Sequence, residues 1–140
     1  MNLRIFVIEH IESIMQQEDF IKREIERIGA IISAVRQLLF GGKDNLSIVL
    51  EKQMDDIKGM LRRDTGFDID KFLSMNDIEA DSYVDNLRGY SIENVELLAE
   101  VLSRIGHRNQ SHPYMEKALL LYQHCNAKDK NLFPATRNSD

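Results

Sequence analysis

The residues best suited to bind a metal ion are three histidines and the single cysteine near the end of the chain: His107, His112, His124 and Cys125. Zinc prefers imidazole and thiolate ligands, and a zinc site brings three or four of them to about 2.0–2.3 Å from the ion. His124 and Cys125 are adjacent, so on a helix their side chains point about 100° apart and do not converge. We therefore interpret the histidines as surface residues near a turn and Cys125 as a buried core thiol.

Acidic residues in the middle of the chain are the second candidate for chemistry. Asp55-Asp56, Asp68-Asp70 and Asp77-Glu79-Asp81 resemble carboxylate pairs or calcium ligands. A calcium-binding loop also needs a central glycine and a glutamate at its twelfth position, and these are missing. We interpret these acids as solvated helix starts and caps.

Gly41-Gly42-Lys43 resembles a phosphate-binding loop only in part, because it follows a predicted helix and lacks the first glycine and the hydroxyl after the lysine. We therefore expect no metal, no cofactor and no enzymatic activity. The alternative hypothesis is a small metal- or ligand-dependent enzyme that uses His107, His112 and acids of the middle region.

Charge is distributed unevenly along the chain, which carries a net charge of -5. From Asp64 to Glu100 there are ten acids against two bases, and from Val101 onward six bases against three acids. The acidic middle repels phosphates, so we expect no nucleic-acid partner. A single cysteine permits no internal disulfide, and the apolar start is too short to span a bilayer. We expect a cytoplasmic protein without a membrane partner.

The elements that position these residues are helices, because there are two prolines and no alternating apolar runs typical of strands. The clearest predicted helix lies between Gln17 and Phe40. Its apolar residues are spaced alternately four and three apart, which forms one stripe along a helix. We call this stripe the seam, and we predict that its residues form a packing or dimer surface. They are Ile21, Ile25, Ile28, Ile32, Val35 and Leu39.

The seam continues toward the N-terminus through Val7, Ile11 and Ile14, interrupted only by Glu18. One helix from about Leu3 to Phe40 is therefore possible. A break near residues 16–18 and a short strand at the start remain alternatives. A continuous helix would be roughly 57 Å long, which exceeds the span of a compact domain of this size. Part of it would project or contact a second chain.

Turn and cap residues divide the rest of the chain. Gly41 and Gly42 end the first helix, and Asp44 or Asn45 can cap the second. The second helix ends at Gly66 and should fold back on the first as an antiparallel hairpin. Further helices are predicted over residues 68–75, 76–89, 91–106 and 111–126, with Pro113 in the first turn of the last. Their predicted N-caps are, in order, Asp68, Asn76 or Ser74, Ser91 and Ser111. We expect a single helical domain over residues 1–127, with an N-terminal extension at 1–14 and a polar tail at 128–140.

The two helices over residues 92–126 resemble a single tetratricopeptide (TPR) repeat. Large and small residues occur at that repeat's spacing, with Gly106 at its turn: Val95, Leu98, Ala99 and Leu102 on the first helix, Ser111, Met115 and Ala118 on the second. The aromatic residue of the first helix and the proline after Leu121 are missing. The resemblance implies a right-handed α-α superhelix. To this the seam adds a long N-terminal helix.

The segment Met15-Gln16-Gln17-Glu18-Asp19-Phe20-Ile21-Lys22-Arg23-Glu24-Ile25-Glu26 is similar to the opening of a family of small, uncharacterised bacterial helical proteins. That resemblance implies a fold and no established activity. The long seam favours a non-enzymatic interaction or scaffold protein that forms a homodimer and binds an unknown protein partner.

Overall fold

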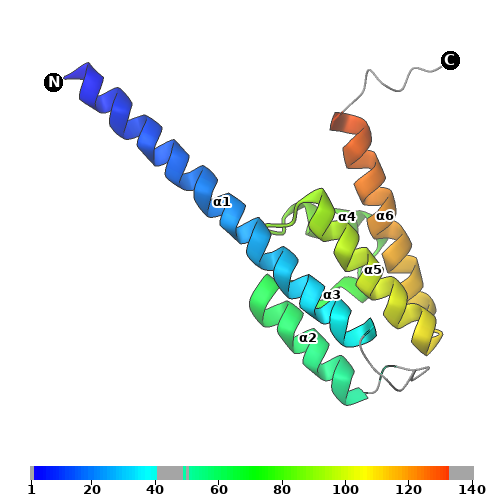
Figure 1. The fold of residues 1–140 in the computed structure, drawn as a ribbon. Coiled ribbons are helices and arrows are strands. Elements are labelled where there is room, and N and C mark those ends of the chain that lie inside the picture. The colour runs from blue at the N-terminus through cyan, green and yellow to red at the C-terminus, as the bar shows by residue number, and fades with distance from the viewer. Residues whose placement is uncertain (1, 41–48, 50, 133–140) are drawn as a thin grey trace.

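The computed structural model describes residues 2–40, 49 and 51–132, with side chains to residue 130. The described ranges are helical and contain no strand (Figure 1). The six helices are α1 (Leu3–Phe40), α2 (Glu51–Thr65), α3 (Ile69–Leu73), α4 (Asp77–Asp85), α5 (Ile92–Asn109) and α6 (His112–Leu132). The prediction of an all-α fold is confirmed.

α1 is one continuous helix of 38 residues. The break predicted as an alternative near residues 16–18 is absent, and so is the short strand. Figure 1 shows the first half of α1 extending away from the other helices, while its second half packs on α2 and α5. The proposed helix end at Gly41 and Gly42 and the proposed cap at Asp44 or Asn45 lie outside the described residues.

α2 runs antiparallel to the second half of α1. Arg27 Nη1 donates a 2.6 Å hydrogen bond to the carbonyl of Asp64, and Gln53 Nε2 donates one of 3.2 Å to the carbonyl of Leu38. Early residues of α2 therefore lie beside late residues of α1. α2 is followed by Gly66, whose φ of +76° takes the chain out of the helix.

α3 and α4 begin at the caps that the sequence predicts. Asp68 accepts a hydrogen bond from the backbone of Lys71, and Asn76 forms a reciprocal capping box with Glu79. α4 ends at Asp85, earlier than the end predicted at Gly89. Gly89 instead lies in the loop to α5 with a φ of +80°, where a Cβ atom would come within 2.5 Å of Ile28 Cδ1.

α5 is capped by Ser91 as predicted, but it continues past Gly106 to Asn109. The prediction that Gly106 closes the helix was wrong. Gly106 permits close packing with α6, since a Cβ atom there would lie 2.7 Å from Met115 Cγ. Gln110 ends the helix with a φ of 50°.

α6 extends to Leu132, beyond the predicted helix end at about Asn126 and into the segment predicted as a polar tail. Lys128 forms an ion pair with Asp85 of α4, which holds this last part of the helix against the body. Ala127, Lys128 and Lys130 are also strong helix formers.

The core surrounds α5, which contacts α1 on one side and α6 on the other (Figure 1). Leu98, Leu102 and Ile105 of α5 are fully buried. An aromatic cluster of Phe67, Phe72 and Tyr83 fills the space around α3, with ring centroids 5.0–6.0 Å apart. The core therefore holds the second half of α1 in place and leaves its first half without cover.

Candidate functional site

The first half of α1, residues 3–23, carries most of the large apolar side chains that are exposed in the described residues. We call it the projecting half of α1. Its large apolar side chains have exposed fractions between 43% and 73%: Leu3, Ile5, Phe6, Val7, Ile8, Ile11, Ile14, Met15, Phe20 and Ile21. Monomeric proteins rarely leave so many apolar side chains together in water, so this surface is a candidate interaction site.

The six seam residues divide between the core and this surface. Ile28, Ile32, Val35 and Leu39 are buried in the body, with at most 1% of each exposed. Ile25 is half-buried at the boundary, and Ile21 is 55% exposed. The same stripe of one straight helix therefore enters the core at one end and faces solvent at the other.

A shallow groove lies where the projecting half of α1 leaves the body. It is lined by Ser13, Gln16, Gln17, Phe20, Ile21 and Arg88. Arg88, from the loop before α5, places its guanidinium 5.9 Å from the centre of the Phe20 ring. This contact gives Phe20 partial cover through a cation–π interaction, while Ile21 beside it stays 55% exposed.

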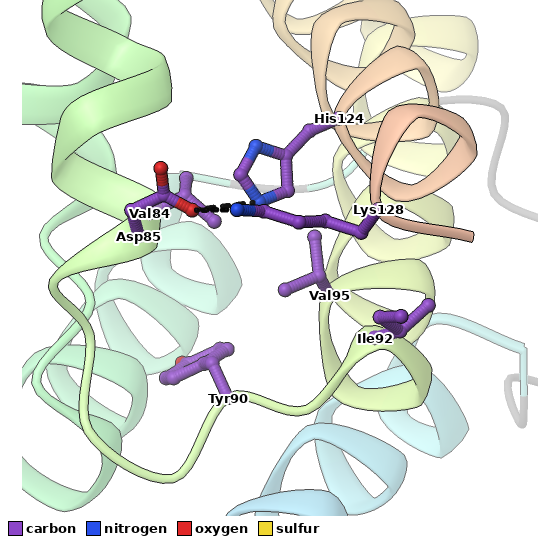
Figure 2. A pocket seen from close by; sticks show the side chains of 7 residues that line it. All are labelled: Val84, Asp85, Tyr90, Ile92, Val95, His124 and Lys128. Carbon is purple, nitrogen blue, oxygen red and sulfur yellow. Dashed lines mark ion pairs between the residues drawn. The ribbon is translucent and has the colours of Figure 1, made fainter. Parts of the chain in front are cut away.

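A second candidate is a small pocket between α4, α6, the start of α5 and the loop before it (Figure 2). Its apolar wall comes from Val84, Tyr90, Ile92 and Val95, and its polar rim from Asp85, His124 and Lys128. The cavity volume is about 120 Å³. Ligand pockets usually hold roughly 300–1,000 Å³, so this one has room for only a few atoms.

The polar rim of that pocket is an ion-pair network. His124 Nδ1 lies 2.6 Å from Asp81 Oδ1, and His124 Nε2 lies 3.4 Å from Asp85 Oδ1. Lys128 Nζ lies 3.0 Å from the same Asp85 oxygen. Figure 2 shows the side chains of Asp85, His124 and Lys128 converging. Both ring nitrogens of His124 face carboxylates of α4, so the ring joins α4 to α6.

The apolar wall of the pocket is anchored by Tyr90. Its hydroxyl donates a 2.7 Å hydrogen bond to Thr65 Oγ1, and Thr65 in turn donates to the carbonyl of Leu61. Burial raises the pKa of Tyr90, which keeps the phenol protonated. These bonds tie the loop before α5 to the end of α2, which is a structural role.

The histidines and the cysteine considered above as metal ligands are not brought together. His107 and His112 are exposed near the turn between α5 and α6, as interpreted. Cys125 is buried, with its Sγ 3.7 Å from the carbonyl of Ile92. His124, however, is only 8% exposed, so its interpretation as a surface residue was wrong. Within residues 2–40, 49 and 51–130, no group of three or more potential ligands is arranged to hold a metal ion.

The chemical state of Cys125 agrees with a packing role. Burial raises the pKa of the thiol to about 11, with nearby acids such as Glu96 adding to the effect. A thiol with so high a pKa carries little thiolate at neutral pH and is a poor nucleophile.

The network around His124 was missed in the sequence, although its spacing was visible. Asp81 and Asp85 are four apart on α4, and His124 and Lys128 are four apart on α6. Residues four apart lie on one face of a helix, so two acids on one helix can meet two basic residues on another.

No family model, curated protein or solved structure matches this chain. In the part of the chain that the structure describes, no helix is long and apolar enough to cross a membrane. The geometry of the two candidate sites is therefore the basis for a functional proposal, and the projecting half of α1 is the stronger of the two.

Proposed function

We propose that this protein is a non-enzymatic helical interaction protein that self-associates through the projecting half of α1. One observation carries the proposal. The seam that is buried at Ile28 and Ile32 continues without a change of register to Val7, Ile11 and Ile14, which are 43–50% exposed. These residues have the same apolar spacing as the buried part of the helix, but they are exposed to solvent. A partner that covers them explains both facts.

The stability of an isolated helix supports the same proposal. Residues 3–23 form a stretch of about 21 residues with little tertiary contact, whereas most of the stability of helices in proteins comes from tertiary packing of an apolar face. Packing against a second helix would stabilise this stretch through burial of the apolar stripe. A second copy of the chain supplies the same stripe and buries both at once, in a two-fold symmetric dimer.

We also propose that α5 and α6 form a TPR-like pair that presents a surface to a further protein partner in the cytoplasm. Support comes from small residues at the contact between the two helices. Ala99 and Ala118 are buried, and Gly106 lacks the Cβ atom that would collide with Met115. Small residues allow two helices to approach closely, as helical repeats require.

The test is the mass of the protein in solution over a range of concentration. We expect the wild-type chain to shift from monomer to dimer as its concentration rises to high micromolar. Ile14→Glu should weaken the dimer at least a hundredfold, because it buries a charge in the stripe. The matched control is Gln16→Glu, which adds the same charge on the opposite side of the same turn and should dimerise like the wild type.

The thermal unfolding of Ile14→Glu separates association from folding. Ile14 is 43% exposed and far from the core, so the body of the variant should unfold as the wild-type monomer does. A wild-type chain that remains monomeric at high micromolar concentration would contradict the proposal.

A further inference from the structure

We infer that the two copies pair their projecting halves antiparallel, so that the N-terminus of each lies beside the start of the body of the other. This inference rests on the proposed self-association and adds its geometry. Three observations support it: the positions of two charges in the stripe, the length of the exposed segment, and the packing of α5 over the seam beyond Ile25.

The stripe extends one step further toward the N-terminus than its apolar residues do. At spacings of three and four it reads Arg4, Val7, Ile11, Ile14, Glu18 and Ile21. Two of its six positions are therefore charged, with opposite signs, and they lie near the two ends of the projecting half. Charged side chains in a helical seam determine which orientation of the pair is favourable.

A parallel pair in register is unfavourable for these charges. Each seam residue would then face its own copy, so Arg4 would meet Arg4 and Glu18 would meet Glu18. Like charges held against each other at a partly desolvated interface cost free energy that the apolar layers must offset.

An antiparallel pair brings the opposite charges together. If the two-fold axis passes between Glu12 and Ser13, Ile11 packs against Ile14 of the second copy. Arg4 then lies one layer from Glu18 of the second copy, and the symmetry repeats this contact at the other end. Ile11 and Ile14 of both copies, four apolar side chains in all, form the centre of the pair. An ion pair between Arg4 and Glu18 lies near each end.

The length of the exposed segment fits this register. With the axis between residues 12 and 13, Leu3 lies opposite Lys22 of the second copy, so the overlap covers the projecting half almost completely. Glu24 and Ile25 are the first residues of α1 that the body partly buries. The end of each helix therefore reaches the body of the other copy without entering it.

The body also disfavours the parallel arrangement. Beyond Ile25 the seam is covered by the chain's own α5, where Asn94 Nδ2 donates a 2.9 Å hydrogen bond to the carbonyl of Ile25. A parallel partner would continue along that covered face, and its own body would need the space that α5 occupies (Figure 1). The antiparallel partner ends before this point.

A lipid surface is the less favourable occupant. Helices that lie on membranes usually carry lysine and arginine along their polar face. The projecting half has four acids, Glu9, Glu12, Glu18 and Asp19, against three bases, Arg4, Lys22 and Arg23. This balance gives no attraction to anionic lipids, whereas it suits a second copy with the same mixed charges.

The orientation is tested by distances between spin labels placed on single cysteines in a Cys125→Ala background. In the antiparallel pair, labels at Glu12→Cys have almost no separation along the helix axis, while labels at Arg23→Cys are separated along that axis by roughly 30 Å, at 1.5 Å per residue. In a parallel pair neither position has a separation along the axis, so the two positions give similar distances. Similar distances would overturn the orientation and leave self-association standing, whereas a monomer without any inter-label distance would overturn both.

Charge reversal is an independent measurement on the chain without labels. Arg4→Glu should weaken the antiparallel dimer about tenfold, because it places two acids one layer apart at each end. Adding Glu18→Arg to that variant should restore the wild-type dissociation constant. In a parallel pair Arg4→Glu exchanges one like-charge contact for another, so an unchanged dissociation constant would also overturn the inference.

Discussion

The side chain of Asn94 on α5 occupies the space left by the missing side chain of Gly29 on α1. A Cβ atom at Gly29 would lie 2.8 Å from Asn94 Oδ1. From this position Asn94 Nδ2 donates hydrogen bonds of 2.9 Å to the carbonyls of Ile25 and Gly89. Asn94 therefore joins α1, α5 and the loop between α4 and α5 at the point where the projecting half leaves the body.

Gly29→Ala should destabilise the protein by about 1–2 kcal/mol, because the new methyl group displaces the Asn94 amide from its hydrogen bonds. This loss exceeds the gain of about 1 kcal/mol that alanine gives as the better helix former. Gly59→Ala on α2 is the matched control, since its Cβ meets no atom within 4 Å. Gly59→Ala should stabilise the protein by up to about 1 kcal/mol. Denaturant unfolding of both variants checks this, and equal effects would contradict the role of Asn94.

Two substitutions at seam positions should separate the core from the association surface. Ile32→Asp should unfold the protein or cost more than about 4 kcal/mol, because Ile32 is fully buried and the aspartate would have no partner. Ile11→Asp should leave the unfolding free energy of the monomer within about 0.5 kcal/mol of the wild type, because Ile11 is 49% exposed. Measuring both variants at a concentration below dimerisation avoids contributions from association. A large loss of monomer stability in Ile11→Asp would contradict the free position of the projecting half.

His124→Ala should loosen α4 from α6, since the imidazole contacts both Asp81 and Asp85. We expect a loss of about 1–2 kcal/mol in unfolding free energy and faster hydrogen exchange in α4. His112→Ala is the matched control, because His112 is an exposed histidine at the start of the same helix. Equal exchange in α4 for both variants would show that the network does not hold that helix.

Alkaline pH should lower the stability of the folded protein. Burial raises the pKa of Cys125 to about 11 from an ordinary value of 9.0. Between these values the unfolded chain releases the thiol proton while the folded protein retains it, so stability is full below about pH 9 and falls as the pH rises toward 11. The contribution of this one group is at most about 2–3 kcal/mol. Cys125→Ala should flatten the pH dependence of unfolding, and an identical slope in both proteins would contradict it.

The sequence predicts the local boundaries that depend on short-range chemistry. Asp68, Asn76 and Ser91 act as N-caps where their side chains and positions indicated. The 3.5-residue spacing likewise identified the face of α1 that is buried from Ile28 onward. Such features are set by residues within one or two turns of each other.

Features that depend on distant packing were not predicted correctly. Glycine is common just after the end of a helix, and this led to the prediction that α5 ends at Gly106. Gly106 instead lies inside α5, where Met115 of α6 occupies the space that a side chain would need. His124 was assigned to the surface because nothing adjacent in the chain indicates that α4 places Asp81 against it. The seam could not show where α1 leaves the core, because its pattern is the same on both sides of Ile25.

The most direct test of the central claim is hydrogen exchange of residues 3–23 as a function of protein concentration. In the monomer these amides belong to an unsupported helix and should exchange rapidly. As the protein dimerises, their protection should rise strongly, while that of α5 should stay unchanged because it is already buried. Protection of residues 3–23 that is the same at low and high micromolar concentration would contradict self-association through α1.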